Sequence, residues 1–395
     1  MNDVTIIAAF VLLLAAGLAE AAMHRRRIAH FSIRVNVNGT RGKSTVTRLI
    51  AAGLSSAGIR TVGKTTGTTP RIILPDGAEE PIRRRGRARI SEHVWVAKKA
   101  FEAGAEALVV ECMALEEENQ RVYEHMLVKS TIGVITNIRR DHLDVMGPGL
   151  DDVARTLAIT IPKNGHLVTV DGPFTKMLME KCEAMGTELR IASGDSVSPE
   201  ELAMFGYTSF AENVAVALAV CEIAGVDRRT ALRGMVGARP DPGVSPVADI
   251  MLSGRKLHIV DAFAANDVES TLKMWEDFAL PLKQSYDKSF VVVNNREDRP
   301  QRVEEMSKLA AALMADRVFY IGKLQHLAMR MTPSGYEGAG AVHEKTPGAI
   351  LERVLCELPE GATALVFLAG NTKGAGSLLT EHIRELTAES GGSRA

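Results

Sequence analysis

The fold is decided by residues 38–45, which read Asn38-Gly39-Thr40-Arg41-Gly42-Lys43-Ser44-Thr45. Before them, residues 31–37 alternate between apolar and polar side chains, which is the period of a half-buried strand. After them, apolar side chains recur at helical spacing from Val46 to Ala57, and Gly58 follows as a stop signal. The N–H groups of a glycine-containing turn and of a helix N-terminus form a cradle for anions. We therefore expect residues 38–45 to bind the phosphates of a nucleotide.

Two side chains of this loop have the chemistry of phosphate and metal binding. Lys43 can reach the β- and γ-phosphates, and the Ser44 hydroxyl can ligate Mg²⁺. The general P-loop pattern has a glycine where this chain has Val37, so the chain carries a shorter variant of the motif. An ordinary Gly-Lys-Ser turn is the alternative, which the flanking strand and helix disfavour. The loop thus predicts ATP and Mg²⁺ as cofactors.

Short apolar runs alternate with helix-like stretches along the rest of the chain. The expected strands are residues 107–110, 131–135, 166–170, 257–260, 290–293, 318–321 and 364–368. Strands that alternate with helices are typical of a mostly parallel sheet covered on both faces, so the predicted fold class is α/β. Two prolines and flanking glycines in residues 237–243 predict a linker. We expect a P-loop ATPase domain over residues 25–238 and a smaller Rossmann-like domain over residues 239–395.

The N-terminus is strongly biased in composition. Residues 4–23 are almost entirely apolar, and the basic stretch Arg25-Arg26-Arg27 follows closely. A helix that spans a bilayer needs roughly 20 apolar residues, and basic residues after the run place the following chain in the cytoplasm. A cleavable signal peptide would carry positive charge before the run, where this chain has Asp3. We expect residues 1–24 to be a single-pass anchor in the inner (cytoplasmic) membrane; a buried or interfacial helix is the alternative.

The composition restricts the classes of function. Lys and Arg number 47 against 48 Asp and Glu, and a nucleic-acid binder would need a clear basic surplus, so we expect no nucleic-acid partner. A local basic run, Arg83-Arg84-Arg85 with Arg87 and Arg89, has the charge to attract a polyanion, although such runs are usually solvated faces or headgroup contacts. The four cysteines are scattered without metal-ligand spacing, which predicts a reducing compartment and no zinc site.

Several elements resemble, in the same order, those of the Mur ligase and folylpolyglutamate synthetase superfamily. They are the loop 38–45, Val109-Val110-Glu111-Cys112, Thr136-Asn137-Ile138-Arg139-Arg140-Asp141-His142-Leu143-Asp144, and Val260-Asp261-Ala262-Phe263-Ala264-Ala265-Asn266-Asp267. The resemblance runs from about residue 31 to about residue 376 and implies a ligase that consumes ATP. In the last element the proline of the family is replaced by Asp267.

This resemblance implies roles for individual residues. Mg²⁺ ligands would be Ser44, Glu111 and His142; catalysis would also use Lys43, and Arg239, which touches phosphates when the domains close. The implied nucleotide contacts are Asn38, Gly39, Thr40, Arg41, Gly42, Lys43, Ser44, Thr45, Asn213 (at the adenine), Asp261 and Asn266. Substrate contacts are expected at Lys64, Thr65, Thr66, Arg296 and Lys373, which lie in loops after strands. Many relatives carry a carbamylated lysine after the metal-binding histidine; residues 155–161 hold no lysine, so a second Mg²⁺ site stays open.

A membrane helix joined directly to such a core, with Asp141 to Gly147 reading DHLDVMG, looks like the ligase subunit family of poly-γ-glutamate synthases. The resemblance implies that ATP activates the γ-carboxylate of glutamate or of a growing poly-γ-glutamate chain as an acyl phosphate. The α-amine of glutamate then forms the amide, and ADP and phosphate are released. A small polytopic membrane partner subunit is also implied, and a homo-oligomer is compatible with this.

Three other functions stay open. A folylpolyglutamate-type ligase would share the chemistry but leave the membrane helix unexplained. A membrane-anchored P-loop kinase or ATPase would need neither the 141–144 element nor Asp261 and Asn266. A non-catalytic assembly subunit is disfavoured by the intact Lys43, Glu111 and His142. Whether D- or L-glutamate is used is not determined by the sequence.

Overall fold

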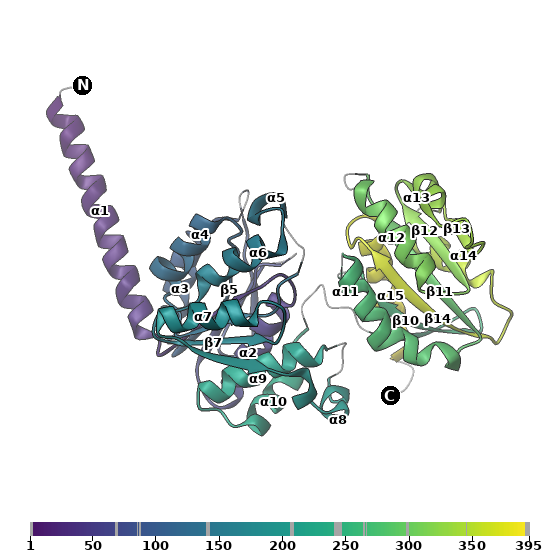
Figure 1. Cartoon of the computed structure of the whole chain (residues 1–395), viewed down its shortest axis with the longest axis horizontal. Coiled ribbons are helices and arrows are strands. Elements are labelled where there is room, and N and C mark those ends of the chain that lie inside the picture. Colours follow the sequence, from purple (N-terminus) through teal and green to yellow (C-terminus); the bar gives the residue numbers. More distant parts are fainter. Residues whose placement is uncertain are drawn as a thin grey trace. The chain divides into compact units, whose positions relative to one another are not determined.

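A computed structural model describes residues 3–67, 70–84, 86, 88–139, 143–205, 209–240, 247–263, 265, 267–297, 300–344 and 346–391. The chain divides into two compact units, Met1–Pro242 and Gly243–Ala395. Each unit is a sheet covered by helices (Figure 1). The predicted α/β class with mostly parallel sheets is confirmed.

The sheet of unit 1 has eight strands in the order β4-β3-β2-β5-β1-β6-β7-β8. Their bounds are β1 Ile33–Asn38, β2 Thr61–Lys64, β3 Arg71–Ile73, β4 Glu79–Pro81, β5 Ala107–Glu111, β6 Ile132–Ile135, β7 His166–Val170 and β8 Glu188–Ala192. From β2 to β8 all neighbouring strands are parallel, whereas β3 and β4 add an antiparallel edge. The carboxyl ends of β2, β5, β1 and β6 therefore lie side by side.

Helices cover both faces of this sheet. They are α1 Asp3–His30, α2 Lys43–Ser56, α3 Glu92–Glu102, α4 Glu117–Val122, α5 Leu143–Met146, α6 Leu150–Leu157, α7 Thr175–Met185, α8 Pro199–Ala203, α9 Ala211–Ile223 and α10 Arg228–Val236, with a π-helical turn at Tyr123–Val128 and 3-10 turns at Ala158–Thr160 and Gly194–Ser196. On one face α2, α9 and α10 share a buried cluster with Val109. On the other, α3 and the end of α1 share a cluster with the next residue, Val110, as strand alternation requires.

The connections of unit 1 change direction beside β1. From β1 the chain crosses through α2 to β2 on one side, whereas from β5 it continues to β6 on the other side. Open α/β sheets bind ligands at the carboxyl ends of strands where the connections diverge in this way. The loop after β1 is therefore placed at the binding edge of the sheet.

Unit 2 has a six-stranded sheet in the order β13-β12-β11-β14-β10-β9, in which β9 is antiparallel to β10 and the other pairs are parallel. The strands are β9 Val247–Leu252, β10 Arg255–Asp261, β11 Lys288–Asn295, β12 Arg317–Gly322, β13 Ala339–Ala341 and β14 Thr363–Gly370. The helices are α11 Val268–Met274, α12 Pro300–Ala312, α13 Gln325–Met331, α14 Pro347–Leu355 and α15 Ala375–Gly391, with helical turns at Trp275–Ala279 and Leu280–Ser285. The last strand, β14, inserts between β10 and β11, so the carboxyl ends of β11 and β14 lie side by side.

The first helix extends out from the sheet of unit 1 (Figure 1). Within the described chain, residues Thr5–His30 form one helix that is long and apolar enough to cross a membrane. From Ile6 to Met23 its apolar side chains are exposed apart from the half-buried Ala22, whereas His24 and Ile28 are buried against the domain together with Phe31, which follows the helix. The helix therefore ends in a foot, residues 24–31, that belongs to the core of unit 1.

Candidate active site

The loop between β1 and α2 requires glycine at two positions. Gly39 has φ 122° and Gly42 has φ 79°, a region that other residues rarely adopt. A Cβ atom on Gly39 would lie 2.2 Å from Oγ1 of Thr136, and one on Gly42 would lie 2.6 Å from Oδ1 of Asn213. The structure therefore brings Asn213, predicted to face the adenine, directly to the phosphate loop.

Two residues after β6 fix the loop from the side. The Asn137 Oδ1 atom accepts hydrogen bonds from the Thr40 hydroxyl (2.6 Å) and from the N–H of Arg41 (3.1 Å). The Thr136 hydroxyl donates to the carbonyl of Arg41 at 2.6 Å. Neither Thr136 nor Asn137 was among the candidate site residues, although a Thr-Asn pair directly after a strand next to β1 was a usable signal.

Asn38 supports the base of the loop. Its buried amide Nδ2 donates to Gln120 Oε1 (2.9 Å) and Thr160 Oγ1 (3.1 Å), and its Oδ1 accepts from the N–H of Gly39 at 2.8 Å. Its side chain is thus engaged by protein groups. A nucleotide would meet the backbone of the loop that this side chain shapes.

The Lys43 ammonium folds back over the loop. Its Nζ donates to the carbonyl oxygens of Gly39 (2.7 Å) and Thr40 (3.2 Å). These oxygens lie on the cradle itself, so phosphate oxygens can replace them as partners with a small movement of a flexible side chain.

Glu111 connects three parts of the site. One carboxylate oxygen of Glu111, at the end of β5, accepts hydrogen bonds from the Ser44 hydroxyl (2.8 Å) and from the N–H of Thr66 (2.6 Å). A hydroxyl oxygen next to a carboxylate is the kind of ligand set that Mg²⁺ prefers, so these residues fit the predicted ion. No group of three His, Cys, Asp or Glu side chains that could hold a metal occurs among the described residues. His142 lies outside them.

The loop after β2 separates its predicted substrate residues. Thr66 meets Glu111, and Thr65 bridges to Arg71 through its N–H (2.9 Å) and hydroxyl (3.3 Å). Lys64 is fully buried and points to the other face, where its Nζ lies 3.2 Å from Glu92 Oε1. Burial lowers the pKa of the Lys64 ammonium, and the Glu92 carboxylate opposes this shift.

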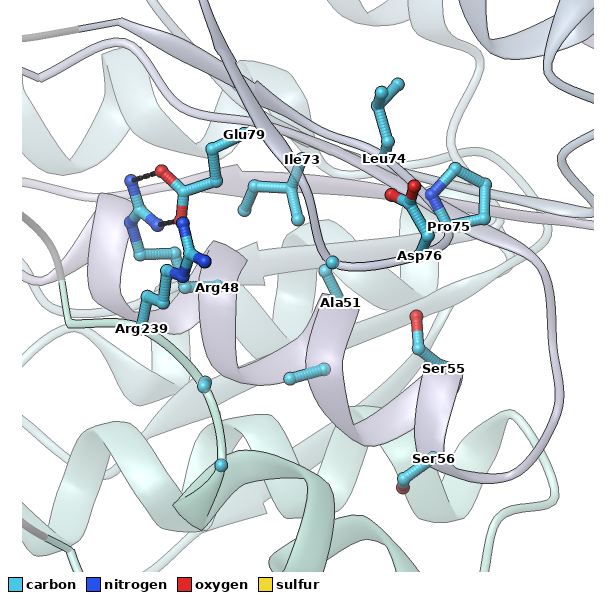
Figure 2. Close-up of a pocket in the computed structure, with 14 residues that line it drawn as sticks. Arg48, Ala51, Ser55, Ser56, Ile73, Leu74, Pro75, Asp76, Glu79 and Arg239 are labelled. Carbon is cyan, nitrogen blue, oxygen red and sulfur yellow. Dashed lines mark hydrogen bonds and ion pairs between the residues drawn. The ribbon is translucent and has the colours of Figure 1, made fainter.

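Arg239 lies at the flank of α2. It lines a cavity of about 360 Å³ beside the ion pair of Arg48 and Glu79, in which Arg48 Nη2 lies 3.2 Å from Glu79 Oε2 (Figure 2). The cavity follows α2 from Arg48 to Ser56. Arg239 forms no hydrogen bond or ion pair with another residue in the described parts of the chain, and its guanidinium is exposed.

In unit 2, Asp261 ends β10 and shapes the loop that follows. Its carboxylate accepts hydrogen bonds from the N–H of Phe263 (3.0 Å) and from the hydroxyl of Thr380 (2.6 Å). Asn266, predicted to act with it, lies outside the described residues. The carboxylate is buried and engaged by the protein, which is the arrangement of a residue that holds a loop in place.

The ends of β11 and β14 are joined by two asparagines. Asn294 Nδ2 donates to the carbonyl oxygens of Asn371 and Lys373, the latter at 3.0 Å, and the N–H of Asn371 donates back to the carbonyl of Asn294 at 2.9 Å. Arg296 is half-buried just after β11, and Lys373 is exposed just after β14. The structure thus brings these two predicted substrate residues to neighbouring strand ends, whose loops Asn294 and Asn371 hold together.

Sequence and structure comparisons agree with this fold. Residues 37–221 match the Mur ligase middle domain, and residues 247–386 match the poly-gamma-glutamate synthase CapB C-terminal domain. Among solved structures, folylpolyglutamate synthase from Thermotoga maritima aligns with a TM-score of 0.59 at 14% identity over 97% of each chain. MurF from Acinetobacter baumannii aligns with a TM-score of 0.63 at 14% identity over 91% of this chain and 79% of its own. These likenesses establish the fold.

The fold, the matched families and the phosphate loop define an ATP-dependent amide ligase of the Mur ligase kind. "PGA synthase CapB" of Bacillus subtilis is 36% identical over 386 residues, covering 96% of this chain and 97% of the relative. "Capsule biosynthesis protein CapB" of Bacillus anthracis is 40% identical over 319 residues, covering 79% of this chain and 68% of the relative. The chain belongs to the CapB family of poly-γ-glutamate synthases. The predicted enzyme class and the resemblance to this family are confirmed.

Proposed function

We propose that this chain forms the γ-glutamyl amide bonds of poly-γ-glutamate and activates the carboxylate as an acyl phosphate at the expense of ATP. The observation that carries the proposal is the Glu111 carboxylate, which meets both the Ser44 hydroxyl of the phosphate loop and the N–H of Thr66 in the predicted substrate loop. An acceptor carboxylate bound at Thr66 would therefore lie next to the γ-phosphate of a nucleotide bound at Ser44.

The chemistry proceeds in two displacements. An oxygen of the acceptor's γ-carboxylate attacks the γ-phosphorus of ATP, the bond to the β-phosphate oxygen breaks, and ADP leaves. The α-amine of the incoming glutamate then attacks the acyl carbon, loses a proton, and expels phosphate as the amide forms. Because anions meet in the first step, the dominant requirement is positive electrostatic potential at the transferring phosphoryl group.

The residues of unit 1 supply this potential. Lys43 would exchange its carbonyl partners Gly39 and Thr40 for phosphate oxygens. Mg²⁺, held by Ser44, Glu111 and His142, would neutralise charge on the phosphates. Arg239, exposed and without a partner among the described residues, is free to join a phosphate. Asn213 beside Gly42 would contact the base of the nucleotide.

The adjacent carboxyl ends of β11 and β14 in unit 2 suit the amino-acid substrate. Arg296 and Lys373 follow the carboxyl ends of β11 and β14, which are parallel neighbours, and ligand loops of open α/β sheets gather at such ends. A guanidinium and an ammonium there would bind the two carboxylates of glutamate. The amide groups of Asn294 and Asn371 hold the two loops together.

The first helix would anchor the enzyme as a single-pass protein of the cytoplasmic membrane, with both units in the cytoplasm. A polymer made there needs a path out, which one helix does not provide. A small polytopic membrane subunit is the expected partner, with α1 as its contact, and a homo-oligomer is compatible with this assembly.

The test is phosphate release from ATP by the full chain in detergent, with and without glutamate. We expect Mg²⁺-dependent release that glutamate stimulates, with γ-linked product seen by mass spectrometry. Lys43→Ala should lose this release, whereas Lys176→Ala, an exposed lysine on α7, should retain it. Release that ignores glutamate would support an ATPase instead. If nothing is released even with the membrane partner present, a non-catalytic assembly role replaces the proposal.

A further inference from the structure

A basic segment joins β4 to α3 and carries arginines that the mechanism above does not use. Arg83 and Arg89 are exposed, and the guanidinium group of neither forms an ion pair or hydrogen bond in the part of the chain that the structure describes. Arg84 differs, because its guanidinium is bound by Glu92 through two hydrogen bonds of 2.8 and 3.1 Å. Arg83 and Arg89 therefore present uncompensated positive charge to solvent.

The acidic residues on either side do not neutralise these arginines, since each already has basic partners. The pairs are Glu79 with Arg48 and Arg71, Glu80 with Lys99, and Glu92 with Lys64 and Arg84. The sequence of the segment adds Arg85 and Arg87. The positive charge of this edge of unit 1 is thus a net surplus in a chain whose overall charge is −1.

The segment begins at the candidate active site. The N–H of Ile82 donates to the carbonyl of Pro70 at 2.9 Å, and Pro70 ends the threonine-rich loop that follows β2. At the other end of that loop, the N–H of Thr66 meets the Glu111 carboxylate. One hydrogen bond therefore links the start of the basic segment to the loop expected to hold the acceptor.

The same segment leads to the foot of α1. Ile82 and Ile90, which bracket the arginines, pack in the buried cluster that contains Ile28 and Phe31. Directly after the segment, the ring of His93 lies 6.0 Å from that of His24, between centroids. His24 precedes the exposed Arg25 and Arg26 on α1. Exposed arginines therefore occur next to the proposed substrate loop (Arg83), at the end of the basic segment (Arg89) and beside the apolar part of the first helix (Arg25 and Arg26).

We propose that the growing poly-γ-glutamate chain leaves the active site along this basic segment and is led to the membrane helix. The inference rests on the proposed function, because a γ-linked glutamate polymer carries one free α-carboxylate per residue. These carboxylates pair with Arg83 and Arg89 and, at the membrane, with Arg25 and Arg26. Guanidinium groups match carboxylates in geometry, yet exposed pairs are individually weak, so the polymer is held by many contacts and still moves along them.

The test measures binding of end-labelled poly-γ-glutamate of defined length to the full chain in nanodiscs of uncharged phosphatidylcholine, without ATP. We expect salt-sensitive binding that weakens roughly five- to tenfold in the double variant R83Q/R89Q, and that R83K/R89K retains. The control K176Q/K181Q removes the same charge from α7, which packs beside β8 at the opposite edge of the sheet from β4, and should bind as the wild type does.

A second set of nanodiscs, containing phosphatidylglycerol, distinguishes a lipid contact from a polymer contact. If R83Q/R89Q binds polymer as tightly as the wild type but loses affinity for anionic discs, the surface is a headgroup contact and the proposal is overturned. Equal weakening of polymer binding in R83Q/R89Q and in K176Q/K181Q would also overturn the proposal, since any basic residues on the surface would then bind the polymer equally well. Wild-type protein that joins glutamate but does not bind polymer refutes the path alone. Polymer binding without any ligase turnover, even with the membrane partner present, refutes the proposed function instead.

Discussion

The Ser44 hydroxyl donates a 2.8 Å hydrogen bond to the Glu111 carboxylate, across 67 positions of sequence. Ser44 is the second residue of α2, which follows β1, and Glu111 is the last residue of β5. The contact therefore depends on the parallel pairing and the register of β1 and β5. The N–H of Thr66 meets the same carboxylate oxygen. This oxygen is therefore the point at which the proposed nucleotide loop, the proposed metal and the proposed substrate loop come together.

Substitutions of Ser44 and Glu111 should change the Mg²⁺ requirement. We expect Ser44→Ala to raise the Mg²⁺ concentration for half-maximal phosphate release about tenfold, and Glu111→Gln to lower the maximal rate at least about a hundredfold. If both act on one ion, the double variant should be no slower than Glu111→Gln alone, because residues that act as a unit are not additive. Ser55→Ala, at the far end of α2, is the control and should leave the Mg²⁺ curve unchanged.

Gly42→Ala should weaken nucleotide binding by at least about tenfold, measured by ADP titration calorimetry. The added Cβ would lie 2.6 Å from Asn213 Oδ1 and would also strain the backbone, where φ is 79°. Gly58→Ala is a matched control, because its φ is 82° but nothing lies within 4 Å of the added Cβ. Equal loss of affinity in the two variants would show that backbone strain, and not the contact with Asn213, controls the loop.

Parallel strands explain why much of this arrangement could be predicted. Each apolar run that was expected to be a strand coincides with an observed strand to within one residue or lies inside it; these strands are β5, β6, β7, β10, β11, β12 and β14. Neighbouring parallel strands bring their carboxyl ends to one edge of the sheet. That rule is enough to predict Ser44 and Glu111 as neighbours. The short edge strands β3, β4 and β13 were not predicted, because three residues carry too little periodicity.

Side-chain direction was harder to predict than position. Lys64 ends its strand near Glu111, yet strand alternation turns it to the face of α3 and into contact with Glu92. The sequence showed Thr136 and Asn137 after a predicted strand. Their hydrogen bonds to the backbone carbonyl of Arg41, however, depend on the conformation of the loop. The predicted anchor ended at residue 24, whereas α1 continues to His30, because the foot of the helix packs into unit 1.

The buried pair of Lys64 and Glu92 should respond asymmetrically to substitution. Glu92→Gln leaves a fully buried ammonium without its carboxylate and should destabilise the folded chain by about 3–5 kcal/mol. Lys64→Met should cost less than about 1 kcal/mol, because Glu92 keeps its two hydrogen bonds to Arg84. Urea unfolding in detergent measures both. The double variant should recover most of the loss, and a double variant as unstable as Glu92→Gln would contradict this account.

Glu124 should make stability fall as pH rises. Its carboxyl is buried, and burial raises its pKa above the ordinary value, against the opposing hydrogen bonds from Asn36 and Ser130. A raised pKa in the folded state means that its contribution to stability is full below about pH 4.3 and is lost as pH rises through the folded-state pKa. As the pH increases above about 4.3, the wild type should therefore lose stability relative to Glu124→Gln. The total loss is about 1.4 kcal/mol for each tenfold by which folding increases the proton affinity of the Glu124 carboxyl.

The quantity to follow is the difference in unfolding free energy between the wild type and Glu124→Gln at each pH. Any cost of the Gln side chain that does not vary with pH has no effect on how this difference changes with pH. That cost should be modest, because Asn36 Oδ1 has no partner and can accept from the new amide if the Asn36 side chain flips. Parallel stability curves for the wild type and Glu124→Gln from pH 4 to pH 8 would show that folding does not raise the pKa of the Glu124 carboxyl, and would contradict this account.

Removal of the first helix should have two different outcomes that depend on where the cut falls. A chain that begins at Met23 loses the apolar part of α1 but none of its buried side chains, so it should be soluble without detergent and keep the thermal midpoint of unit 1. A chain that begins at Ser32 also loses Ile28 and Phe31, which are 3% and 0% exposed. Burial of two such side chains contributes about 3–6 kcal/mol, so the midpoint should fall by about 10 °C or more. Equal midpoints for the two truncated chains, measured by circular dichroism, would show that the foot of α1 is not part of the core.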